Sequence, residues 1–350
     1  MNSVKIITDS EGARLIKRAQ NIDNEEDIIL NEGENNLDNL EYGFHFDEIC
    51  SSNKITSIDL NDYDTSNITD MSYMFTRFNV SSLDCSNFNT RNVKSMLAMF
   101  CGCKKLSSIN LNSFDTRNTK DMSFMFGGCE NLENIDLSSF NTHNVKEMEF
   151  MFGLCCKLPS LDLSNFNTKN VTNMNKMFCE CNELKELDLS NFDVSKVTDM
   201  GSLFESCKEL NTLNINTWVT PRLKKMVNIF AGCNSLTTLD IRGFDTSKVT
   251  DMSGSFAACC NLKTLDLSNF NTDKVIDTCF MFGGCKCLEE LDLSNFNMNK
   301  VRFCSGMFYA CECLKRIKCN RAFKEWCLEK RDMIDLPFVM LDDNSWDIID

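Results

Sequence analysis

The 350-residue chain has few prolines and glycines, which interrupt helices and strands, and few histidines, which often act in catalytic sites. It has 3 prolines, 14 glycines and 2 histidines, which are His45 and His143. No stretch rich in Ser, Gly and Pro marks a linker between independent domains. No run of about 18 apolar residues predicts a membrane-spanning helix, and residues 1–30 lack the apolar core of a secretory signal. We expect a continuous body without membrane insertion and, by this criterion, a cytoplasmic protein.

The charge balance and the missing motifs argue against two further classes of function, nucleic-acid binding and catalysis. With 51 Asp and Glu against 36 Lys and Arg, the formal net charge is -15. Such a chain repels a phosphate backbone, so we expect no binding of nucleic acid. No Gly-rich phosphate loop and no Gly-x-Ser-x-Gly phrase occurs, and the acidic residues recur in a line instead of gathering at one point. We therefore expect no enzymatic activity and no cofactor.

What the chain does have is a repeat. Nine phenylalanines lie 26 residues apart: Phe100, Phe126, Phe152, Phe178, Phe204, Phe230, Phe256, Phe282 and Phe308. A period in this range is typical of a solenoid, because a single repeat cannot bury its apolar face without a neighbour. We predict an α/β solenoid of about ten repeats, capped at both ends, built from short parallel strands with short helices or helical turns.

One repeat, residues 132–158, divides into three parts. Leu132, Ile135 and Leu137 alternate as a short strand does, and a polar turn follows Phe140. The apolar residues from Met148 to Cys155 then fall at i, i+3, i+4 and i+7, which indicates a short helix or helical turn. Residues 145–148 allow a second small strand as the alternative.

The ends of the chain depart from the repeat. We predict an N-terminal cap over residues 1–54, a solenoid over 55–318 and a C-terminal cap over 319–350. The N-terminal cap includes a possible helix near residues 12–20. In the C-terminal cap, Asn320 is placed to begin a helix that runs to about Asp332.

The phrase Leu-Asp-Leu-Ser-Asn-Phe-Asn-Thr over residues 161–168, with Asn-Val-Thr-Asn-Met-Asn-Lys-Met-Phe-x-x-Cys over 170–181, resembles the leucine-rich repeats of BspA-like bacterial surface proteins. The resemblance covers residues 55–318 and extends to the C-terminal tail. It implies a leucine-rich-repeat solenoid displayed at a cell surface that adheres to host or matrix proteins without enzymatic activity. The alternative function, favoured by the absent signal peptide, is an intracellular protein-interaction scaffold.

The 21 cysteines include a column of nine that follows the repeat: Cys103, Cys129, Cys155, Cys181, Cys207, Cys233, Cys259, Cys285 and Cys311. A buried row of free thiols is the plain interpretation, because free cysteine packs as a small apolar residue. Disulfides along the row stay open, since neighbouring strands lie within the distance that a bridge needs. With two histidines and no Cys-x-x-Cys pair, we expect no metal site.

Charged residues also form columns. The column inside the Leu-x-Leu strand carries Asp59, Asp84, Asp136, Asp162, Asp188, Asp240, Asp266 and Asp292. A basic edge follows the polar turn, with Arg91, Arg117, His143 and Lys169 in early repeats and Lys196, Arg222, Lys248, Lys274 and Lys300 in later ones. These cations either pair with the aspartates or contact an acidic partner.

An aromatic column, from Tyr63 and Phe88 to Phe296, follows each strand and is expected in the core. Its irregular member is Trp218, which together with Pro221 breaks the consensus and so becomes a candidate contact. Our binding candidates are therefore the cations of the basic edge other than His143, with Asp162, Asp188, Asp240, Asp266 and Trp218. The expected partner is a protein of unknown identity, bound by a monomer.

Overall fold

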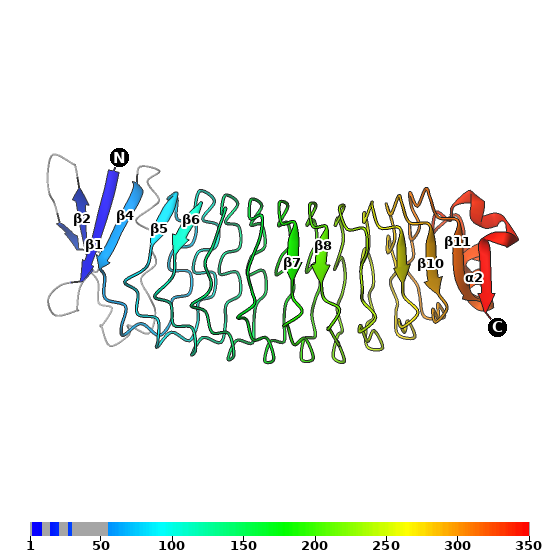
Figure 1. Cartoon of the computed structure of the whole chain (residues 1–350), viewed down its shortest axis with the longest axis horizontal. Coiled ribbons are helices and arrows are strands. Elements are labelled where there is room, and N and C mark those ends of the chain that lie inside the picture. Colours follow the sequence, from blue (N-terminus) through cyan, green and yellow to red (C-terminus); the bar gives the residue numbers. More distant parts are fainter. Residues whose placement is uncertain (1, 9–14, 21–26, 30–54, 350) are drawn as a thin grey trace. The chain divides into compact units, whose positions relative to one another are not determined.

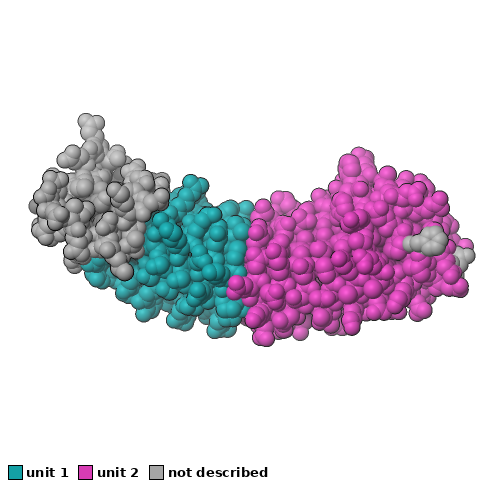
Figure 2. Space-filling model, turned by 90° about the horizontal axis from the view of Figure 1, so that it is seen from above, with its two compact units in different colours: residues 1–167 teal, residues 168–350 magenta. Residues whose placement is uncertain are grey.

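The computed structural model describes residues 2–8, 15–20, 27–29 and 55–349. It divides into two compact units, Met1–Asn167 and Thr168–Asp350, which Figure 2 colours teal and magenta. Within each unit the chain winds as a parallel β-solenoid with little helix, which confirms the predicted fold class (Figure 1).

The strands are short, and partners along the solenoid lie one repeat apart. In unit 1, β5 (Ser82–Asp84) pairs in parallel with β6 (Ser108–Asn110). In unit 2, β7 (Glu186–Asp188) pairs with β8 (Thr212–Asn214), and β9 (Thr264–Asp266) pairs with β10 (Glu290–Leu293). Each pairing joins residues 26 positions apart, as Leu83 with Ile109 shows. The sequence period is thus the register of the sheet.

A different sheet precedes the repeats in unit 1. It contains β1 (Asn2–Thr8), β2 (Leu15–Gln20), β3 (Asp27–Ile29) and β4 (Ile55–Asp62) in the order β3-β2-β1-β4. β1 runs antiparallel to β2 and parallel to β4. The possible helix over residues 12–20 is therefore wrong for residues 15–20, which pair as a strand, and its residues 12–14 lie outside the described part.

Stacked aromatic rings and thiols fill the core. In unit 1, the rings of Phe75, Phe100 and Phe126 stack with centroids 5.5 Å apart at each step. Cys129 packs beside them, and its thiol donates to the carbonyl oxygen of Phe100 at 3.2 Å. The bond recurs in unit 2, where the Cys233 thiol donates to the carbonyl of Phe204 at 3.1 Å. The predicted buried cysteine row is confirmed, and the same bond recurs at Cys155, Cys207 and Cys285.

The Met-Phe segment is a run of turns. The Met151 N–H bonds to the Met148 carbonyl at 3.3 Å, and the Cys155 N–H bonds to the Phe152 carbonyl at 3.1 Å. The third residue of each turn has a left-handed backbone, with φ of 53° at Phe150 and 61° at Leu154. A positive φ ends a right-handed helix, so the helical-turn version of the prediction fits and a regular helix does not. The alternative small strand also exists, as a single parallel bridge between Asp121 and Glu147.

Buried threonines lock the polar corners of successive repeats together. The Thr116 side chain is fully buried. Its hydroxyl donates to the Asn141 carbonyl at 3.0 Å and accepts the Asn141 N–H at 2.7 Å. In unit 2, the Thr246 hydroxyl makes the same two bonds with Asn271, at 2.9 and 2.8 Å. The polar corners therefore form buried hydrogen bonds between repeats in addition to presenting exposed side chains.

The C-terminal segment closes unit 2. Helix α2 (Arg321–Lys330) begins where predicted, with the Asn320 side chain accepting the Phe323 N–H at 2.8 Å. Beyond α2, the carbonyls of Met333 and Ile334 accept the N–H groups of Gly306 and Phe308, at 2.9 and 2.8 Å. The remaining elements are η2 (Phe338–Leu341), η3 (Asp343–Ser345), β11 (Arg316–Asn320) and β12 (Trp346–Ile349), and β12 pairs in parallel with β11. This segment therefore takes the place of a further repeat.

Candidate functional site

The predicted aspartate column lies where each repeat enters a turn, and Asp84, Asp188 and Asp266 are the last residues of β5, β7 and β9. The carboxylate of Asp162 accepts the Ser164 N–H at 2.9 Å, and that of Asp188 accepts the Ser190 N–H at 3.0 Å. These backbone hydrogen bonds lower the pKa of both carboxyls. The bond recurs at Asp266, where the Ser268 N–H donates at 3.0 Å.

An oxygen acceptor recurs in this column whether the side chain is neutral or charged. Asn110 occupies it in one repeat and accepts the Asn112 N–H at 3.3 Å. Asp240 has its own cation, because Arg242 donates a hydrogen bond to it, which lowers the carboxyl pKa, and forms an ion pair at 2.6 Å. The aspartates therefore hold the turn after each strand, and local bonds offset their mutual repulsion.

The cations of the basic edge are exposed at the polar corners: Arg91 and Arg117 in unit 1, and Lys169, Lys196, Arg222, Lys248, Lys274 and Lys300 in unit 2. Arg117 pairs with Asp115 at 2.8 Å, and Lys196 bonds to the Asn170 side chain at 2.8 Å. Lys248 bonds to the Pro221 carbonyl at 2.7 Å. For these three, the predicted pairing with the aspartate column is wrong, because Arg117 bonds within its own corner and the two lysines bond to the corner of the preceding repeat.

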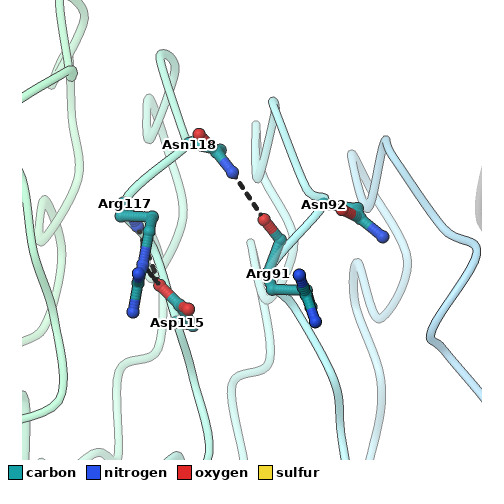
Figure 3. Close-up of a pocket in the computed structure, with 5 residues that line it drawn as sticks. All are labelled: Arg91, Asn92, Asp115, Arg117 and Asn118. Carbon is teal, nitrogen blue, oxygen red and sulfur yellow. Dashed lines mark hydrogen bonds and ion pairs between the residues drawn. The ribbon is translucent and has the colours of Figure 1, made fainter.

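A pocket lies on the basic edge of unit 1. It has a volume of about 360 Å³ and is lined by Arg91, Asn92, Asp115, Arg117 and Asn118. Figure 3 shows Arg91 and Arg117 on neighbouring repeats, with the Asn118 amide donating to the Arg91 carbonyl at 2.7 Å. Arg117 donates to Asp115 through Nε at 2.8 Å. The pocket therefore brings together two of the predicted cations.

A second row of cations beside this pocket was missed by sequence reasoning. Lys94, Lys120 and Lys146 are exposed and follow the same period of 26 residues. Their backbones form a ladder, since the Lys120 N–H bonds to the Lys94 carbonyl and the Lys146 N–H to the Lys120 carbonyl, both at 2.9 Å. The signal was present, because each lysine follows Arg91, Arg117 or His143 by three residues.

Trp218 is a correction. Its side chain is 1% exposed, and its indole N–H donates to the Leu189 carbonyl at 3.1 Å. It stacks on Phe244 as a member of the aromatic core column, so it is not a surface contact. The irregular repeat is instead accommodated by Gly243, where a Cβ atom would lie 1.8 Å from the Trp218 carbonyl oxygen.

Large apolar side chains are exposed near the C-terminal end of unit 2. We define an apolar patch as Phe280, Phe303, Tyr309 and Met333, which are 48%, 58%, 56% and 53% exposed. The rings of Phe280 and Tyr309 meet edge to face at 6.4 Å. The Phe280 ring covers Gly306, whose N–H bonds to Met333, and the Phe303 carbonyl accepts the Thr278 N–H at 2.8 Å. No periodic signal marked these residues, because each belongs to a different column.

The 20 cysteines in the described part are free. No helix among the described residues is long and apolar enough to cross a membrane. Burial raises the pKa of the Cys259 and Cys311 thiols to about 12, so they stay protonated at neutral pH.

Parallel ladders one repeat apart, a stacked core and long exposed columns define a repeat solenoid of the kind that binds other molecules along its surface. Residues 44–159, 155–238 and 224–336 match the family described as Mycoplasma protein of unknown function, DUF285, and the chain belongs to this family. No curated protein matches it.

Proposed function

We propose that the chain is a non-enzymatic protein-binding solenoid. The observation that carries this proposal is the apolar patch, where four large side chains, each about half exposed, come from neighbouring hydrogen-bonded turns of unit 2. Removing such side chains from water stabilises a complex by about 25 cal/mol per Å² of apolar surface, and clusters of this kind mark interaction sites. Aromatic side chains also supply most hot spots of protein interfaces.

The patch is held in place by the backbone beneath it. The Phe280 N–H bonds to the Ser305 carbonyl at 2.9 Å, and the Phe280 φ of 53° is a left-handed value that bulky residues rarely adopt. A Cβ atom on Gly306 would come within 2.4 Å of the Phe280 ring, so glycine makes room for that ring. A ring fixed in this way loses little conformational freedom when a partner covers it.

The test is co-purification from the source cells with quantitative mass spectrometry. We expect a protein that the native full-length chain enriches to be lost with the double variant Phe280→Ser and Phe303→Ser. The matched control is Val219→Ser, because Val219 is 61% exposed in the same unit and lies outside the patch. Identical enrichment by the native chain and the double variant would reject the proposal.

A protein-binding solenoid is compatible with two cellular roles. Our first proposal is adhesion at a cell surface, which the resemblance to BspA-like proteins supports. The second is an intracellular interaction scaffold, which the 20 free cysteines favour because thiols persist in reducing compartments. Thiol titration of protein isolated from its native source separates them: bridged cysteines support the first role, and titratable cysteines support the second.

A further inference from the structure

Three consecutive repeats of unit 1 concentrate positive charge on an acidic chain. We define the basic corner as the side chains of Arg91, Lys94, Arg117, Lys120 and Lys146. The segments that carry them, 89–94, 115–120 and 141–146, contain one carboxylate, Asp115. Five cations and one anion give these segments a net charge of +4 with His143 neutral, whereas the whole chain carries -15.

Hydrogen bonds between repeats fix both rows of the basic corner. The Asn118 amide donates to the Arg91 carbonyl at 2.7 Å, and the Asn144 amide donates to the Arg117 carbonyl at 2.8 Å. The lysine row has its own backbone ladder, in which the Lys120 N–H bonds to the Lys94 carbonyl at 2.9 Å. The backbone segments that carry the cations therefore recur at the spacing of parallel strands, about 4.8 Å.

Most of this charge has no internal partner. Among the described residues, the guanidinium of Arg91 and the ammonium groups of Lys94 and Lys120 form no ion pair. Arg117 lines the pocket and binds Asp115 through its Nε at 2.8 Å. Like charges held this close repel one another, so an anion placed among them would relieve that repulsion.

The residues next to the lysine row indicate which kind of anion the basic corner can bind. The lysine row borders an acidic row, because Asp121 follows Lys120 and Glu147 follows Lys146. A continuous phosphate backbone would have to pass beside these carboxylates on a chain of charge -15. Separated carboxylates can instead reach the guanidinium groups, whose planar donors match a carboxylate in a bidentate bond.

We propose that the basic corner binds the carboxylates of an acidic peptide segment on a partner protein. This inference rests on the proposed protein-binding function and adds the chemistry of one contact. In the bound state, one carboxylate occupies the pocket between Arg91 and Arg117. A second carboxylate of the same segment pairs with Lys94 or Lys120.

The test uses the full chain and a fluorescein-labelled peptide of alternating Glu and Gly, followed by fluorescence anisotropy. We expect binding that weakens as salt increases and that falls about tenfold in the double variant Arg91→Gln and Lys120→Gln. The matched control is Lys104→Gln with Lys105→Gln, which removes the same charge from exposed residues of unit 1 outside the basic corner. The control should bind as the native chain does.

Three outcomes would overturn the inference: no binding of the Glu peptide, equal loss in both double variants, or tighter binding of a DNA duplex than of the Glu peptide. None of them touches the proposed function, which is tested at Phe280 and Phe303 in the other unit. Conversely, if the apolar patch proves inert while the peptide result stands, the basic corner is an anion site and the protein-binding proposal loses its main support.

Discussion

Replacing Thr116 by Val tests the hydrogen bonds that join the polar corners. Valine keeps the shape of the fully buried side chain but removes the hydroxyl, which makes two bonds to Asn141, at 3.0 and 2.7 Å. Each such bond stabilises a fold by about 1 kcal/mol, so the loss should be about 2 kcal/mol. Because solenoid repeats interact with their neighbours, the loss should appear locally first.

Hydrogen exchange of the Asn141 amide is the direct assay. A loss of about 2 kcal/mol would raise its exchange rate roughly 30-fold if exchange follows local opening. Thr116→Ser is the control, because serine keeps both bonds and lacks a methyl group. The reasoning is refuted if the Val variant exchanges as slowly as the native chain, or if the Ser variant loses as much protection as the Val variant.

Three further predictions concern the core, the irregular repeat and the strand ends. The thiol pKa of about 12 at Cys259 and Cys311 lies above the ordinary 9.0, so both thiols contribute stability below pH 9 that is lost as the pH rises toward 12. The free energy of unfolding in urea should therefore fall between pH 9 and pH 12, and an unchanged value would contradict this prediction. Gly243→Ala places a Cβ atom 1.8 Å from the Trp218 carbonyl oxygen and should cost about 2 kcal/mol or more, measured by thermal unfolding, whereas native stability would show that the backbone yields freely. Asp162→Asn keeps an oxygen acceptor for the Ser164 N–H but loses the charge that this bond stabilises, so it should lower stability at neutral pH less than Asp162→Ala does; urea unfolding that finds the Ala variant as stable as the Asn variant would argue against the turn role.

The sequence predicted the elements that depend on period. Residues repeating every 26 positions required stacking, and the registers of β5 with β6 and of β7 with β8 follow this period. Asn320 was recognised as a helix N-cap because its side chain can satisfy a free N–H at the start of a helix. The basic edge was found in the same way, although Lys196 and Lys248 bond to oxygens of the preceding repeat and not to the aspartate column.

What the sequence could not supply was backbone conformation and side-chain direction. The i, i+3, i+4 spacing from Met148 onward suits a helix, but the same spacing suits two consecutive turns whose third residues, Phe150 and Leu154, have positive φ. Trp218 looked like an anomaly on the surface, yet its indole fills a core column. The apolar patch lies outside any period, since Phe280 and Tyr309 come from different columns and their rings meet only in the folded chain.

The carbonyls of Met333 and Ile334 accept the N–H groups that, in an interior repeat such as the one containing Asn228 and Phe230, bond to the following repeat. Each repeat thus has one side that donates backbone hydrogen bonds and an opposite side that accepts them, so the two ends of the stack differ. Excising one full period from within unit 2 would rejoin matching sides, so a shortened chain should still close on the same ending. Removing that ending would leave an open row of donors, onto which another molecule of the same protein could polymerise.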